Sequence, residues 1–120
     1  MSDEAPAVVG IAALAVDCAE PAALAGWWRR LLGGSVEVDD DGDATLHTPG
    51  GLAIDFLRVP EAKTVKNRLH LDLRSADLAA ATEQAVALGA TRADDVYDGG
   101  RWQVLRDPEG NEFCLLRPRP

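Results

Sequence analysis

Residues 105–116 read LRDPEGNEFCLL, and residues 46–57, which lie 59 positions earlier, read LHTPGGLAIDFL. Both segments carry a turn with proline and glycine at matching places, followed by an apolar run typical of a β-strand. The same shift aligns Leu14 with Leu73 and Arg58 with Arg117. A match of this kind along most of a chain predicts two copies of one folding unit.

The first unit spans about residues 8–60. Pro21 fits the first turn of a helix, where its missing N–H costs nothing, and Gly33-Gly34 ends that helix. An acidic turn over residues 39–43 contains Asp-Gly and predicts a hairpin. The expected elements are a strand over 8–16, a helix over 21–32, and strands over 36–38, 44–47 and 52–59.

The second unit, about residues 68–117, repeats this plan after a polar linker over 60–67. Asp77 is the expected N-cap of an Ala-rich helix that ends at Gly89. The expected elements are a strand over 69–73, a helix over 78–88, and strands over 91–93, 102–106 and 112–116. The 120 residues therefore form one domain of two similar modules.

Charge and length exclude several classes of protein. The formal net charge is −8, so a polyanionic nucleic acid would be repelled. The longest apolar stretch, over 8–16, is about half of what a membrane-spanning helix needs. Asp3 and Glu4 stand where a signal peptide would carry positive charge. With two cysteines only, we expect a soluble cytoplasmic protein with no nucleic-acid or membrane partner.

Alternation along the strands divides each of them into an apolar and a polar face. The apolar faces, which include Ile54, Phe56, Phe113 and Leu115, should cover the helices. The opposite faces carry ionisable side chains, and buried charges need partners or ligands. We expect these side chains to line one cup for a polar ligand: Asp55, His70, Asp72, Arg74, Glu112 and Cys114.

Several motifs resemble the glyoxalase-like domains of the vicinal oxygen chelate superfamily. They are the segments NRLHLDL (67–73), ALGA (87–90), DPEGNEFC (107–114), and Trp27-Trp28 followed by Leu32-Gly33. The resemblance covers about residues 8–117. It implies an α+β fold in which two tandem βαβββ modules form an open, curved, barrel-like cup with the helices outside. It also implies a small-molecule ligand and a homodimer.

In that superfamily, metal-binding members take ligands from the first and last strands of each module. The matching positions here are Ile11, Asp55, His70 and Cys114. Ile11 cannot bind a cation, and Cys114 stands where the family usually has glutamate. Asp55, His70 and Cys114 can each bind zinc, so they are the candidate ligands of a divalent metal. The sequence leaves open whether any metal or other cofactor is bound.

Without a metal, His70 is a candidate general base, oriented by Asp72 or Glu112, because histidine side chains titrate near neutral pH. A histidine held in place for structural reasons is the alternative. Glu112 is the second candidate catalytic residue. Trp102 follows the Gly99-Gly100 loop, where it is either core or a stacking platform for a planar ligand. Arg74 is a candidate partner for a ligand carboxylate or phosphate.

Two functions from different classes fit these features. The first is an enzyme of isomerase or lyase type; dioxygenase chemistry is disfavoured, because an iron facial triad needs two histidines and a carboxylate. The second is a metal-free protein of the bleomycin-resistance type that binds a drug or metabolite. A purely structural module is disfavoured by the polar strand faces.

Overall fold

The computed structural model describes residues 6–7 and 10–119. Within them the elements, in chain order, are β1 (Leu14–Cys18), α1 (Pro21–Leu32), β2 (Ser35–Val38), β3 (Ala44–His47), β4 (Ala53–Arg58), β5 (Asp72–Arg74), α2 (Leu78–Ala87), β6 (Thr91–Arg92), β7 (Trp102–Arg106) and β8 (Glu112–Leu116). The order βαβββ occurs twice, as the repeat predicts.

The strands form two four-stranded sheets with the same topology. The first sheet has the order β1-β4-β3-β2, and the second has the order β5-β8-β7-β6. In each sheet the first strand of the module pairs in parallel with the last, and the other pairs are antiparallel. Among the described residues the two sheets do not close into a barrel. The predicted α+β fold of two open modules is therefore confirmed.

Local sequence explains both helices. Pro21 opens α1, and Gly33 follows its last residue with a φ of 82°. Gly34 has a positive φ, and a Cβ there would collide with the carbonyl oxygen of His47, so the turn into β2 requires glycine. Asp77 caps α2 as expected, because its carboxylate accepts from the N–H of Ala80 at 3.1 Å.

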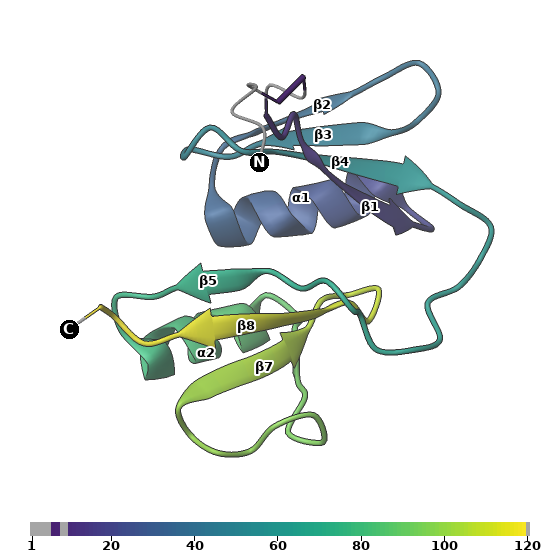
Figure 1. Cartoon of the computed structure of the whole chain (residues 1–120). Helices are drawn as coiled ribbons and strands as arrows, with labels where there is room; N and C mark the ends of the chain where they lie inside the picture. Colours follow the sequence, from purple (N-terminus) through teal and green to yellow (C-terminus); the bar gives the residue numbers. More distant parts are fainter. Residues whose placement is uncertain (1–5, 8–9, 120) are drawn as a thin grey trace.

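Helix α1 lies between the two sheets (Figure 1). Its Trp27 and Trp28 pack against Phe113 of β8, with ring centroids 5.9 and 4.9 Å away. Ile54 and Phe56 of β4 belong to the same buried core. Helix α2 contributes Ala85 to this core and covers the same side of the second sheet. Consequently, the other face of each sheet points outward, away from the helices.

The β7–β8 turn joins the second module to α1. The carboxylate of Asp107 is buried and accepts from the Trp28 indole N–H at 2.9 Å. Glu109 accepts from the backbone N–H groups of Ala19 and Glu20, which immediately precede α1, at 2.7 and 3.0 Å. The DPEGN segment therefore fixes the two modules to each other in addition to forming a turn.

Two strands differ from the expected ranges by more than one residue at an end. The strand expected over 8–16 begins at Leu14, and residues 8 and 9 lie outside the described part of the chain. The strand expected over 69–73 is instead Asp72–Arg74. The side chain of Glu112 binds Lys63 and the N–H of Asn67. The segment before β5 is thus tied to β8 through side chains, and the ladder begins where the Cys114 N–H donates to the Leu71 carbonyl at 2.9 Å.

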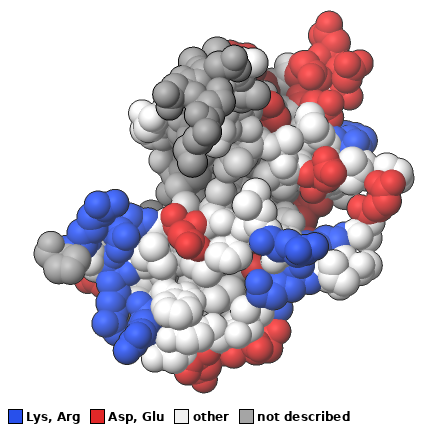
Figure 2. Space-filling model, in the orientation of Figure 1, with Lys and Arg blue, Asp and Glu red and all other residues white. Residues whose placement is uncertain are grey.

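The molecule is more open than its length predicts. Its radius of gyration is 15.9 Å, whereas a compact domain of this size has about 14 Å. Figure 2 shows acidic side chains at the β2–β3 turn and along the lower edge, and basic side chains in separate groups around the second module. The face in this view has no continuous basic surface. Neither helix in the described residues is long and apolar enough to cross a membrane.

Candidate functional site

Three side chains that can each bind a proton or a metal ion meet on the outward face of the second sheet. The parallel register of β5 and β8 places Asp72 opposite Cys114. His70 lies two residues before Asp72, so an extended backbone directs both side chains to the same face. One potential ligand atom from each of His70, Asp72 and Cys114 lies within 4.8 Å of the others. We refer to these residues as the His70 cluster.

Within the His70 cluster, Asp72 fixes the imidazole ring. The distance from His70 Nδ1 to Asp72 Oδ1 is 2.9 Å. When Nδ1 carries the proton it donates to this carboxylate, and Nε2 is left with a free lone pair. The two side chains are 37% and 50% exposed. A small molecule can therefore reach the ring from solvent.

Cys114 forms the buried side of the cluster. It is 7% exposed, and its Sγ lies 4.0 Å from His70 Nδ1. Burial, together with the nearby negative charge of Asp72, raises the pKa of the Cys114 thiol to about 11. The thiol is therefore protonated at neutral pH, and it becomes a strong ligand only if a bound cation displaces the proton.

The His70 cluster lines a hollow of about 430 Å³, which we call the second-sheet hollow. Its volume is within the range of small-molecule sites. Apart from the cluster and two charged residues, Lys66 and Glu112, the lining is apolar or aromatic: Val96, Tyr97, Trp102, Val104 and Leu116. The hollow thus combines ionisable side chains with an apolar and aromatic wall.

Aromatic stacking builds the apolar wall. The rings of Tyr97 and Trp102 stack with centroids 3.9 Å apart and an interplanar angle of 7°. A Cβ at Gly99 would collide with the Tyr97 ring, so a larger residue there would displace the ring. Trp102 is 37% exposed and lines the hollow, and its stacking role toward a ligand stays a prediction. Sequence reasoning missed Tyr97, although it precedes the same glycine pair.

Ion pairs fix the loop that carries Tyr97. Arg106 of β7 donates two hydrogen bonds to the carboxylate of Asp95, at 3.0 and 2.8 Å. Gln103 donates to Asp94 at 3.1 Å. Both donors, Gln103 and Arg106, belong to β7. Their hydrogen bonds therefore anchor the loop to this strand without a ligand.

Glu112 is 5% exposed and both of its carboxylate oxygens are occupied. They accept from Lys63 Nζ, from the Asn67 N–H at 2.8 Å, and from Arg106 Nε at 3.1 Å. Burial opposes ionisation of Glu112, yet the hydrogen bonds from Asn67, Lys63 and Arg106 outweigh it and lower the pKa to about 2. Such a carboxylate is a weak base near neutral pH. The catalytic role of Glu112 stays a prediction.

The exposed Arg74 guanidinium donates to the carbonyl of Arg117 at 2.6 Å. It follows Asp72 by two residues, on the same side of β5. The pocket residues around the His70 cluster do not include Arg74. Its role in holding an anionic group of a ligand stays a prediction.

The predicted gathering of Asp55 with His70 and Cys114 within one chain is wrong. Asp55 accepts from Thr45 Oγ1 on the outward face of the first sheet, opposite the buried Ile54 and Phe56. Because α1 lies between the sheets, this face looks away from the His70 cluster (Figure 1). The alternation of each strand was predicted correctly, but alternation does not state how two modules pack. Asp72, which was expected to be a ligand contact, takes the third place in the cluster.

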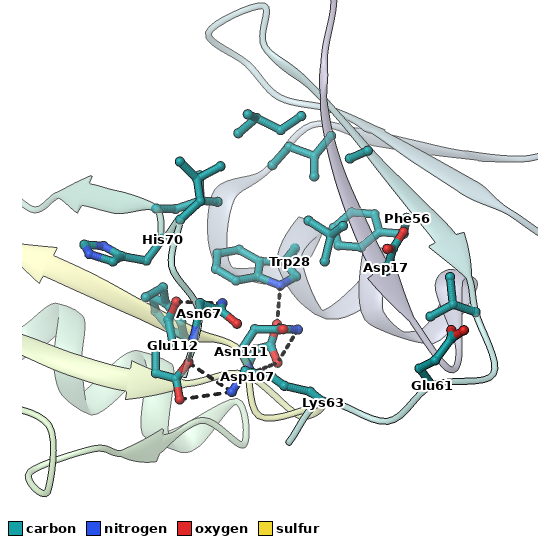
Figure 3. A pocket seen from close by; sticks show the side chains of 18 of the residues that line it. Asp17, Trp28, Phe56, Glu61, Lys63, Asn67, His70, Asp107, Asn111 and Glu112 are labelled. Carbon is teal, nitrogen blue, oxygen red and sulfur yellow. Dashed lines mark hydrogen bonds and ion pairs between the residues drawn. The ribbon is translucent and has the colours of Figure 1, made fainter. Parts of the chain in front are cut away.

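A second, larger cavity of about 700 Å³ lies between the two modules. Its floor includes Trp28, Phe56 and Phe113, and Asp17, Glu61 and Lys63 lie around it (Figure 3). His70 also borders this cavity, but Figure 3 shows its ring pointing away from the centre, toward the second sheet. The larger cavity therefore has titratable side chains of its own, whereas the His70 cluster lines the second-sheet hollow.

Comparisons with known proteins agree with this architecture. The family model for a glyoxalase-like domain matches residues 13–116. The fosfomycin resistance protein FosX from Listeria monocytogenes, complexed with Mn(II) and sulfate ion, superposes with a TM-score of 0.74 at 13% identity, over 93% of this chain and 92% of that chain. A comparison with curated proteins finds no match.

Two further solved structures have the same fold. A glyoxalase/bleomycin resistance protein/dioxygenase family enzyme from Burkholderia phytofirmans PsJN gives a TM-score of 0.71 at 18% identity, over 90% of this chain and 98% of that chain. The oxidase ChaP-H2 gives 0.62 at 21% identity, over 93% and 94%. At these identities the likeness shows the fold alone. Because the family model matches both modules, the chain belongs to the glyoxalase-like domains of the vicinal oxygen chelate superfamily.

Proposed function

We propose that this protein binds a small organic molecule in the second-sheet hollow and catalyses an isomerase- or lyase-type reaction on it. The observation that carries the proposal is that the His70 cluster and an apolar, aromatic wall line the same hollow. A binding site commonly combines an apolar wall with a few polar groups that converge on one point.

His70 would transfer the proton in this reaction. Asp72 holds Nδ1, so Nε2 is the atom that faces a substrate. Nε2 takes a proton from a carbon next to an oxygen-bearing carbon, and Asp72 stabilises the imidazolium that results. In an isomerisation the same ring returns the proton to a neighbouring atom. In a lyase reaction a leaving group departs from the adjacent carbon.

The His70 cluster also fits a divalent cation. Imidazole, carboxylate and thiol are all zinc ligands, and three protein ligands leave positions open for substrate oxygen. A cation held there would polarise that oxygen and stabilise negative charge on it. If the ion were bound by both Nδ1 of His70 and the Asp72 carboxylate, it would replace the hydrogen bond between them.

The apolar wall of the hollow indicates what the rest of the substrate is like. Tyr97 and Trp102 present a rigid aromatic wall, with Val96 and Leu116 beside it. A planar or aromatic group gains both apolar burial and ring stacking against such a wall. We therefore expect a substrate with an oxygen-bearing end at His70 and an apolar end at Trp102.

A homodimer would complete the site. Asp55 and the His70 cluster lie on outward faces of different sheets, and each face is open in the single chain. Two copies related by a two-fold axis can place the first sheet of one over the second sheet of the other, twice. Each site would then receive Asp55 from the second copy. The open shape of the single chain supports this arrangement.

The proposal predicts that His70 is required for proton exchange between substrate carbon and solvent. The probes are small 2-oxo and 2-hydroxy carboxylic acids with aromatic or aliphatic side chains, incubated with the protein in D₂O. Loss of the C–H signal in proton NMR spectra reports exchange. His70→Gln should lower the exchange rate by about 100-fold or more. His47→Gln, which alters a surface histidine paired with Glu37, should leave the rate unchanged.

A rate that His70→Gln leaves unchanged would contradict catalysis by His70. Tight binding of a probe with no exchange in the native protein would instead favour the bleomycin-resistance type of function, in which the ligand is held without reaction. The apolar and aromatic lining of the hollow is compatible with that second function.

A further inference from the structure

The cavity of about 700 Å³ between the two modules, which we call the inter-module cavity, has the size of a small-molecule site. Its apolar lining includes side chains from four elements: Val16 of β1, Trp28 of α1, Phe56 of β4 and Phe113 of β8. All four belong to the buried core or pack against it. The inter-module cavity therefore lies on the helix side of the second sheet, whereas the His70 cluster lies on the outward face.

Several polar groups that line the inter-module cavity are already paired within the protein. The Asp107 carboxylate accepts from the Trp28 indole N–H at 2.9 Å and from the Asn111 side-chain amide at 3.0 Å. Lys63 Nζ lies 3.0 Å from the buried carboxylate of Glu112. These pairs fix the walls of the cavity and neutralise the charge of Lys63.

Two carboxylates on the border of the cavity differ from these pairs. Asp17 of β1 and Glu61 of the linker both line the cavity, and both residues are exposed. None of the ion pairs within the described residues includes either of them. Figure 3 shows both side chains on the opposite side of Trp28 from His70. The inter-module cavity thus has an aromatic floor and, on one side, two negative charges in contact with solvent.

This combination discriminates between ligands by charge. An organic ammonium group near Asp17 and Glu61 gains electrostatic attraction and charge-assisted hydrogen bonds, whereas a carboxylate would be repelled there. Aromatic rings attract cations through their electron-rich faces, and an apolar group gains from burial against Trp28, Phe56 and Phe113. The formal net charge of −8 also attracts a cation toward the protein from a distance.

We infer that the inter-module cavity binds a primary organic ammonium ion that has an apolar, aromatic body. The ammonium group contacts Asp17 and Glu61, and the body lies against Trp28 and Phe113. Asp17 and Glu61 determine the preference for a cation over a neutral or anionic molecule of the same shape. This site is separate from the second-sheet hollow, so its ligand is a second molecule besides the substrate of the proposed reaction.

Three probes of one shape test the charge preference: 4-phenylbutylammonium, neutral 4-phenylbutan-1-ol and anionic 4-phenylbutyrate. The readout is the indole N–H signals of the ¹⁵N-labelled full chain in two-dimensional NMR spectra. Trp28 lines the inter-module cavity and Trp102 lines the second-sheet hollow, so their two signals report which site is occupied. We expect the ammonium probe to shift the Trp28 signal to saturation, with little change at Trp102. It should bind about tenfold more tightly than the alcohol, and 4-phenylbutyrate should bind most weakly.

The exposed positions of Asp17 and Glu61 allow their charges to be removed with little risk to folding. Asp17→Asn and Glu61→Gln should each weaken binding of the ammonium probe about threefold, and the double variant about tenfold. The alcohol should keep its affinity in all three variants. Asp41→Asn, in the β2–β3 turn, and Glu83→Gln, on α2, make the same chemical changes at exposed positions outside the cavity. These two controls should leave both affinities unchanged.

Three results would overturn the inference. They are no saturable shift of the Trp28 signal with the ammonium probe, equal or tighter binding of either other probe, and an affinity for the ammonium probe that the double variant leaves unchanged. A shift at Trp102 alone belongs to the first result and would place the ligand in the second-sheet hollow. The proton-exchange assay on His70 measures a different site, so either proposal can fail while the other holds.

Discussion

At the scale of single residues, two acidic side chains of the second module differ in exposure and in hydrogen-bond partners. Asp72 is half-exposed and contacts His70, so it is available to a ligand. Glu112 is buried, and its carboxylate oxygens accept hydrogen bonds from Lys63, Asn67 and Arg106. Both were expected to face a ligand, because both lie on the polar side of a strand. Hydrogen-bond partners, rather than the strand face, distinguish the solvent-accessible carboxylate of Asp72 from the fully bonded carboxylate of Glu112.

The buried position of Glu112 predicts a pH-dependent contribution to stability. Its pKa is lowered from 4.5 to about 2 in the folded protein. Because the folded pKa is the lower one, the contribution is complete above pH 4.5 and is lost as the pH falls toward about 2. Glu112→Gln should lower the free energy of unfolding at neutral pH by about 2 kcal/mol. Urea unfolding monitored by circular dichroism gives this quantity.

The difference between native protein and Glu112→Gln should shrink across that acid range, because the native carboxyl becomes protonated there. Glu83→Gln, at an exposed position of α2, is the control. It should change neither the free energy of unfolding nor its dependence on pH. A stability gap of constant size at every pH would show that the charge of Glu112 does not produce the effect.

At the scale of elements, helix α1 depends on a turn far away in the sequence. Glu20, at its N-cap position, makes no side-chain cap, and Glu109 of the β7–β8 turn instead accepts from the N–H groups of Ala19 and Glu20. The negative charge of the Glu109 carboxylate also interacts favourably with the positive end of the helix dipole. One carboxylate thus stabilises α1 and holds the modules together.

Replacing Glu109 by alanine should therefore loosen the start of α1. We expect a loss of about 1 kcal/mol in the free energy of unfolding. Hydrogen exchange of the Ala19 and Glu20 amides, followed by NMR, should become faster while the amides of α2 keep their rates. Glu83→Ala serves as the matched control. Unchanged protection at Ala19 and Glu20 would contradict the assigned role of Glu109.

The elements themselves could be predicted from sequence, but their packing could not. Pro21, Gly33, Asp77 and Gly89 mark helix ends through local chemistry, and the predicted helices agree closely with the structure. Strand alternation correctly placed Phe113 and Leu115 against helices. The predicted range of β5 was wrong: it begins at Asp72, and Asn67 of the preceding segment binds Glu112, 45 residues away. No local pattern encodes such a contact.

At the scale of the whole molecule, the repeat indicates two modules but not which faces meet. The sequence places Asp55, His70 and Cys114 at matching positions of the two units, which suggests one shared hollow. In the structure the aromatic side chains of α1 bind the modules through their helical sides, and the polar faces look outward. A single chain therefore keeps Asp55 apart from His70 and Cys114, and the proposed homodimer would bring them together.

A crystal structure of the zinc-loaded protein, with anomalous diffraction recorded at the zinc edge, tests this joined site most directly. The expected result is one zinc peak bonded to His70, Asp72 and Cys114, with Asp55 of a second copy facing it across the hollow. The contradicting result is a cluster without zinc that faces solvent, with no second copy opposite it.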